Sequence, residues 1–122
     1  MTTEKIETPT PESSHVHHVT TADKLPIIKK HGLVPAENGY LNGPATFMTS
    51  PEGTDFWKQE VTDYYGKKPV VLRTAKKNVA LFPDEAGTRD AGAPAHYTTS
   101  NIPANQLEIQ TENGWKPLVE TR

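Results

Sequence analysis

The stretch HVHHVTTADKLPIIKKHGL, residues 15–33, predicts a short strand that leads directly into a helix. Val16 and Val19 alternate imperfectly with polar residues, and the β-branched content of this stretch favours a strand. Thr21 or Asp23 can then cap a helix in which Pro26 lies in or near the first turn, where a missing N–H is tolerated. Gly32 suits the left-handed conformation that commonly ends a helix. We therefore expect the fold to begin with a strand and an amphipathic helix.

Downstream of this unit, the sequence predicts further strands, loops and one more helix. Runs of β-branched and aromatic residues indicate strands, and the Asn113-Gly114 pair is typical of a hairpin turn. Strands are expected at 46–50, 68–74, 78–82 and 96–99, with a hairpin over 107–119. Residues 83–95 are polar, lack periodicity and are expected to form a loop. The order of elements places the chain in the α+β class with two short helices.

The second helix is predicted to start with Ser50 as its cap and Pro51 at its first position. Its apolar residues recur at the spacing of one helix face, and Gly66 is expected to end it. That face consists of Trp57, Val61, Tyr64 and Tyr65. The spacing favours packing of these residues in the core, and a tyrosine ring in a pocket wall is the alternative.

The composition indicates one small domain without a strong surface charge. The chain has 122 residues, a formal net charge of −2 and no cysteine, which excludes disulfides, thiolate metal sites and cysteine nucleophiles. Residues 1–14 are mainly Thr, Glu, Pro and Ser and are expected to be a disordered tail before a single domain over 15–122. No run is apolar enough for a signal peptide or a membrane span, so we expect a cytoplasmic protein with no membrane partner.

The three histidines at 15, 17 and 18 raise the question of a metal site. On a strand, His15 and His17 point to one face and His18 to the other, so at most two of them can share an ion. The sequence has no spacing typical of zinc fingers or of the HExxH motif. A polar tail that runs into a strand accounts for the cluster, and we expect no metal cofactor.

Four short motifs occur in a characteristic order: HVT at 18–20, LPIIKKHGL at 25–33, FMTS at 47–50 and HYTTSNIPANQLEI at 96–109. In this order they resemble the ADP-ribosyltransferase superfamily, especially its small bacterial and phage members. The resemblance spans roughly residues 16 to 118 and implies a split β-sheet domain that binds NAD as its substrate. It also implies transfer of ADP-ribose to a protein or nucleic-acid target that the sequence does not name.

The resemblance assigns roles to individual residues. His18 takes the place of a histidine whose ring contacts a ribose hydroxyl of NAD, while the backbone beside it holds the nicotinamide amide. Phe47 takes the place of an aromatic ring that stacks. The NAD-binding residues implied in this way are His18, Val19, Thr20, Phe47, Thr49 and Ser50, and the catalytic ones are His18, His96 and Tyr97.

The third motif departs from the pattern of the family. ADP-ribosyltransferases usually place a glutamate there, and its negative charge stabilises the positive charge that develops as nicotinamide leaves. The matching strand offers His96 and Tyr97 and no acid. Glu85 or Asp90 from the preceding segment can supply a carboxylate, whereas Glu108 is expected to face away. Two functions stay open: an NAD-dependent transferase, or an inactive module on the same fold that recognises a nucleotide or a partner protein.

Overall fold

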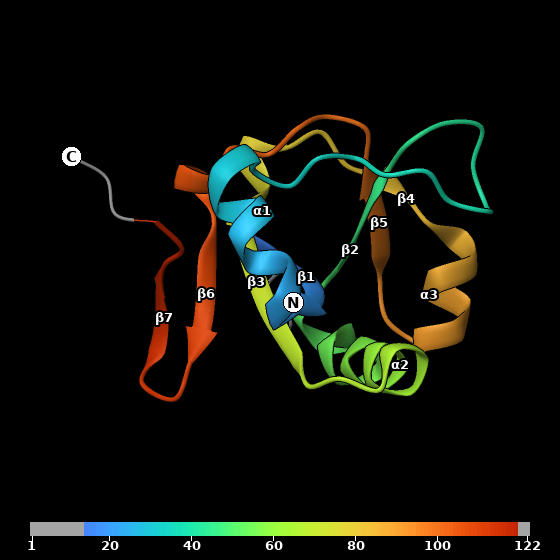
Figure 1. The fold of residues 1–122 in the computed structure, drawn as a ribbon. Coiled ribbons are helices and arrows are strands. Elements are labelled where there is room, and N and C mark those ends of the chain that lie inside the picture. The colour runs from blue at the N-terminus through green and yellow to red at the C-terminus, as the bar shows by residue number, and fades with distance from the viewer. Residues whose placement is uncertain (1–13, 120–122) are drawn as a thin grey trace, which may run out of the picture.

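The structure, a computed structural model, describes residues 14–119. Over this range seven antiparallel strands form one sheet, with three α-helices packed around it (Figure 1). In chain order the elements are β1 (His15–Thr21), α1 (Leu25–His31), β2 (Thr46–Thr49), α2 (Thr54–Tyr65), β3 (Pro69–Ala75), β4 (Phe82–Pro83), α3 (Glu85–Ala91), β5 (Ala95–Thr98), β6 (Glu108–Thr111) and β7 (Gly114–Pro117). Short 3₁₀ helices lie at Ala22–Lys24, Pro51–Gly53, Lys76–Asn78 and Ala104–Gln106. The α+β class is confirmed, but with three α-helices instead of two.

β1 lies at the centre of the sheet, whose strand order is β4-β5-β2-β1-β3-β6-β7. It pairs with β3 along its whole length, His15–Thr21. On its other side it pairs with β2 at a single position of the described chain, His17 opposite Thr49. Beyond this pair the two strands part, as Figure 1 shows. The sheet is therefore continuous on one side of β1 and open on the other.

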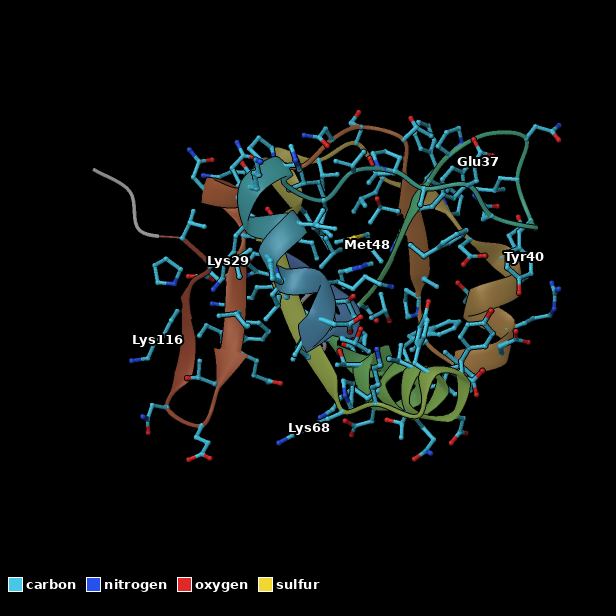
Figure 2. All side chains as sticks on the ribbon, in the orientation of Figure 1. Lys29, Glu37, Tyr40, Met48, Lys68 and Lys116 are labelled. Atoms are coloured by element: carbon cyan, nitrogen blue, oxygen red, sulfur yellow. The ribbon has the colours of Figure 1, made fainter. Side chains whose placement is uncertain are left out.

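The core lies between the middle of the sheet and α1. Ile28 of α1 is buried against it, whereas the neighbouring Ile27 is 65% exposed, which confirms the amphipathic character of this helix. Gly32 ends the helix with a φ of 82°, and a Cβ at this position would collide with the carbonyl oxygen of Ile102. The buried core residues are Val16, Ile28, Leu33, Met48, Leu72, Ile102, Leu107 and Leu118. Figure 2 labels one of them, Met48, near the centre of the domain.

The segment 83–95 contains a helix, α3, so the prediction of a loop was wrong. Asp84 caps this helix, because its carboxylate accepts a hydrogen bond of 3.0 Å from the N–H of Gly87. Gly92 ends it in the left-handed conformation. A helix of seven residues with an internal glycine has little stability of its own, and packing on β5 together with the cap stabilises it.

α2 follows a 3₁₀ turn and ends at Gly66 as predicted. Its expected apolar face is only partly right. Trp57 and Val61 are half-buried, but Tyr64 is 82% exposed and Tyr65 is also exposed. The periodicity of the sequence extends one turn further than the surface against which α2 packs.

Two smaller expectations also change. Ser50 precedes the 3₁₀ turn before α2, but its side chain makes no capping hydrogen bond to the described backbone. The strand expected at 78–82 is an irregular stretch, and only Phe82–Pro83 joins the sheet, as β4. The other predicted strands and the hairpin around Asn113-Gly114 are confirmed, with bounds that differ by a few residues.

The tail expected at residues 1–14 lies outside the described residues except for Ser14. The carbonyl oxygen of Ser14 accepts a hydrogen bond of 2.9 Å from the N–H of Lys76. Between residues 14 and 119, no helix combines the length and the apolar character needed to cross a membrane.

Candidate functional site

A cavity of about 300 Å³ opens where β1 and β2 part. Both strands contribute to its lining, as do α2, α3 and the loop between α1 and β2. That loop supplies Tyr40, whose side chain lies next to α3 in Figure 2. The lining residues are His17, His18, Val19, Tyr40, Phe47, Met48, Thr49, Trp57, Glu60, Val61, Asp84, Ala86, Gly87 and Asp90. This volume is at the lower end for small-ligand sites, so the cavity suits one end of a dinucleotide.

His18 is the member of the histidine cluster that reaches across to β2. Its Nδ1 lies 2.8 Å from the carbonyl oxygen of Phe47. Because a carbonyl oxygen only accepts, Nδ1 carries the proton, and Nε2 of the neutral ring is a hydrogen-bond acceptor. Burial lowers the pKa of His18, an effect that the bond to Phe47 opposes and the positive charge of Lys24 reinforces. At neutral pH, His18 is therefore an uncharged ring that can accept a hydrogen bond from a ligand hydroxyl.

His17 points to the opposite face of β1 and also lines the cavity. Its Nδ1 lies 2.9 Å from the hydroxyl oxygen of Thr54, at the start of α2. Its ring contacts Trp115 of β7, with ring centres 5.0 Å apart. Burial, followed by the positive charge of Arg73, lowers the pKa of His17 to about 4. His17 is thus uncharged at neutral pH as well.

Aromatic rings form part of the cavity wall. Phe47 meets Tyr40 edge-on, with ring centres 6.2 Å apart. Tyr40 is 84% exposed, so it forms an outer edge of the site. Trp57 comes from α2, and its buried indole N–H has no hydrogen-bond partner among residues 14–119.

The charged residues of the lining are all acids in the part of the chain that the structure describes. Glu60 of α2 and Asp90 of α3 are exposed and therefore lie at the mouth of the cavity. Asp84 is half-buried and is already engaged as the cap of α3. Since His17 and His18 are uncharged, the cavity is negatively charged at neutral pH.

The cavity brings together four of the residues that the resemblance implies for NAD binding. His18 and Val19 come from β1, and Phe47 and Thr49 come from β2. His18 and Phe47 are 29 positions apart in the sequence. The parting of the two strands therefore places the first and the second motif on one concave surface.

The other two implied NAD-binding residues, Thr20 and Ser50, lie outside the described lining. Thr20 is buried on β1, where it stands opposite Val70 of β3. Ser50 is buried just after the end of β2. Neither side chain contributes to the cavity surface.

The two residues expected at the third motif, His96 and Tyr97, lie on β5 and outside the lining of this cavity. His96 is opposite Met48 and Tyr97 is opposite Phe47, so they point to opposite faces of the sheet. Tyr97 stacks on Phe82 of β4, with ring centres 5.4 Å apart. The expectation that His96 lines the same concave site as His18 is therefore not met.

Among the acids considered in place of the missing glutamate, Asp90 lines the cavity and Glu85 does not. Glu108 also lies outside the lining, and its carboxylate accepts a hydrogen bond of 2.7 Å from Arg73 of β3. Glu60 and Asp84 also line the cavity, but neither belongs to the four sequence motifs. Asp84 followed eight residues later by a glycine is a capping pattern that would have indicated α3.

The histidine cluster does not gather around one point. His15 lies near the start of β1, where its Nδ1 is 2.9 Å from the hydroxyl of Ser14. His17 and His18 point to opposite faces of the strand. Within the described range 14–119, no three His, Asp or Glu side chains come close enough to hold a metal ion.

No family model matches this chain, and neither a curated protein nor a solved structure matches it. The class of this protein is therefore described from its fold and its cavity alone. The protein is a small α+β domain whose antiparallel sheet opens beside its central strand onto an acidic, aromatic cavity.

Proposed function

We propose that this protein binds NAD, with the nicotinamide and its ribose in the cavity between β1 and β2, on a small split-sheet fold of the ADP-ribosyltransferase kind. The observation that carries the proposal is the convergence of His18, Val19, Phe47 and Thr49 on one cavity. These residues belong to two separate motifs that the resemblance assigns to NAD. A metal ion has no part in the proposal.

The chemistry of the lining supports this assignment. Nε2 of His18 can accept a hydrogen bond from a ribose hydroxyl, because Nδ1 donates to Phe47. The rings of Phe47 and Trp57 offer apolar surface against which the nicotinamide ring can stack. Lys24 is close enough for its charge to lower the pKa of His18, and it offers a positive group to a diphosphate that extends out of the cavity.

The proposed reaction transfers ADP-ribose to a protein or nucleic-acid target. A nucleophile of the target bonds to the ribose carbon and loses its proton to solvent. The bond to nicotinamide breaks at the same carbon, and its electron pair neutralises the leaving pyridinium ring. Asp90 and Glu60, at the mouth of the cavity, are the carboxylates available to stabilise the positive charge that develops on the ribose.

The second candidate is an inactive module on the same fold that recognises a nucleotide or a partner protein. The position of His96 favours it. The family places its glutamate at this point of the third motif, but His96 lies on β5 outside the cavity lining. A ligand can then bind between β1 and β2 without the carboxylate that turnover usually requires.

An NAD titration of ¹⁵N-labelled protein tests the binding. The backbone amides of Val19, Phe47 and Thr49 should shift together, and His18→Ala should abolish these shifts. The matched control is His31→Ala, because His31 is exposed at the end of α1 and lies outside the cavity. Shifts that are absent, scattered over the surface or unchanged in His18→Ala would contradict the proposal.

Release of nicotinamide separates the two candidates. In a transferase, Asp90→Asn should slow release about tenfold or more while NAD-induced shifts persist. Glu85→Asn is the control, since Glu85 lies on the same helix but outside the lining. NAD binding without any release of nicotinamide would favour the inactive module.

A further inference from the structure

The charge of the cavity comes from acids on two different helices. Glu60 extends from α2 and Asp90 from α3, and Lys and Arg are missing from the lining over residues 14–119. Burial lowers the pKa of both lining histidines, which are therefore uncharged at neutral pH. An anionic group placed in this cavity would therefore meet carboxylates in the lining itself, while the positive charges of Lys24 and Arg73 lie outside the lining.

Aromatic rings stand beside these carboxylates. Phe47 and Tyr40 meet edge-on in the wall, and Trp57 faces the same space from α2. The electron-rich face of an aromatic ring attracts a cation, and indole attracts it best. A carboxylate adds Coulomb attraction that is stronger in a partly enclosed cavity than in bulk water. Together, rings and acids favour an organic cation as occupant.

On the other flank of β1, a cation of the chain itself lies between an aromatic ring and a carboxylate. The guanidinium of Arg73 lies 4.3 Å from the ring centre of Trp115. Its Nε donates a hydrogen bond of 2.7 Å to the carboxylate of Glu108. There the chain itself supplies the cation between ring and acid. In the cavity the rings and the acids are present, but within residues 14–119 no Lys or Arg belongs to the lining, and Lys24 and Arg73, whose charges act on His18 and His17, lie outside it.

We infer that the cavity selects its ligand for a delocalised positive charge, and that Glu60 and Asp90 are the specificity-determining residues for that charge. The inference rests on the proposed function in using the same cavity. It names the positively charged nicotinamide ring as the group that the cavity distinguishes from neutral and anionic rings. Its test uses small molecules that lack ribose and phosphate.

The test compares three ligands built on the same pyridine ring by NMR titration: 1-methylnicotinamide, which is a cation, nicotinamide, which is neutral, and nicotinate, which is an anion. We expect 1-methylnicotinamide to bind about tenfold more tightly than nicotinamide, and nicotinate not to bind. The amides of Phe47 and Gly87 should report the binding, since both residues line the cavity. Equal affinity for the cation and the neutral ring, or no binding of either, would overturn the inference.

The double variant Glu60→Gln/Asp90→Asn should reduce the preference for the cation to about twofold or less. The matched control is Glu85→Gln/Asp63→Asn, which removes the same charge from the same two helices at exposed positions outside the lining. A preference that persists in the first variant would overturn the role of these acids. NAD binding without any preference for the cation would overturn this inference alone. A preference for the cation without NAD binding would support this inference and contradict the proposed function.

Discussion

β1 separates two flanks of the sheet that satisfy their polar groups in different ways. On the flank of β3, β6 and β7 the pairing is continuous, and Arg73 lies between Trp115 and Glu108. On the flank of β2, β1 pairs at one position, and rings and acids face a cavity. The closed flank therefore contributes stability through contacts within the chain, whereas the open flank leaves similar groups available to a ligand.

The largest effect that tests this comparison is expected for Leu72→Ala. Leu72 is fully buried on β3, so its truncation should lower the free energy of unfolding by about 2–5 kcal/mol. Leu41→Ala is the matched substitution on the open side, because Leu41 is half-buried in the loop beside Tyr40. It should lower the free energy of unfolding by less than about 1.5 kcal/mol. Equal losses in urea unfolding would show that the two flanks do not differ in this way.

The next effect is the pH dependence of His17. Its pKa falls from an ordinary value of 6.5 to about 4 in the folded protein. Between these values the unfolded chain binds a proton that the folded chain does not, so stability is lost as the pH falls from 6.5 toward 4. We expect His17 to account for a loss of about 1–3 kcal/mol over this range.

Urea unfolding at several pH values measures this loss. His17→Gln removes one titrating group and should make the pH profile shallower, while His18, whose pKa burial also lowers, keeps part of the dependence. His31→Gln, at an exposed position, is the control and should not make the profile shallower. Parallel profiles for the native protein and His17→Gln would contradict the expectation.

A smaller effect on the free energy of unfolding is expected when the contact between Arg73 and Trp115 is removed. A double-mutant cycle of Arg73→Met and Trp115→Leu should give a coupling of about 0.5–1 kcal/mol in the free energy of unfolding, since the guanidinium lies over the indole ring. Trp115→Phe keeps an aromatic ring and should retain part of this coupling. A coupling near zero would show that the contact between Arg73 and Trp115 adds no stability, and would weaken the expectation that the rings of the cavity attract a cation.

The smallest effect is expected for Tyr64→Ala. The sequence places this residue on the apolar face of α2, but its side chain is 82% exposed. The free energy of unfolding should change by less than about 0.5 kcal/mol, and the NAD-induced shifts should be the same as in the native protein. A larger loss would mean that the last turn of α2 packs against another part of the chain.

Much of the fold could be predicted because it depends on residues close together in the sequence. Gly32 needs a positive φ at the end of α1, and the Asn113-Gly114 turn sets the hairpin of β6 and β7. α3 could not be predicted from periodicity, since a helix of seven residues owes its stability to the Asp84 cap and to β5. The exposure of Tyr64 likewise depends on where the packing surface of α2 ends.

The sequence by itself determined that the chain forms a small α+β domain, and the order of its motifs singled out His18 and Phe47. Only the tertiary structure decided that Glu60 and Asp90 join them, because these acids come from two helices placed by long-range packing. It also decided that His96 stays outside, because the alternation of side chains along β5 depends on the register with β2. Local chemistry acts over a few residues, whereas a cavity between two parted strands depends on how the whole sheet pairs.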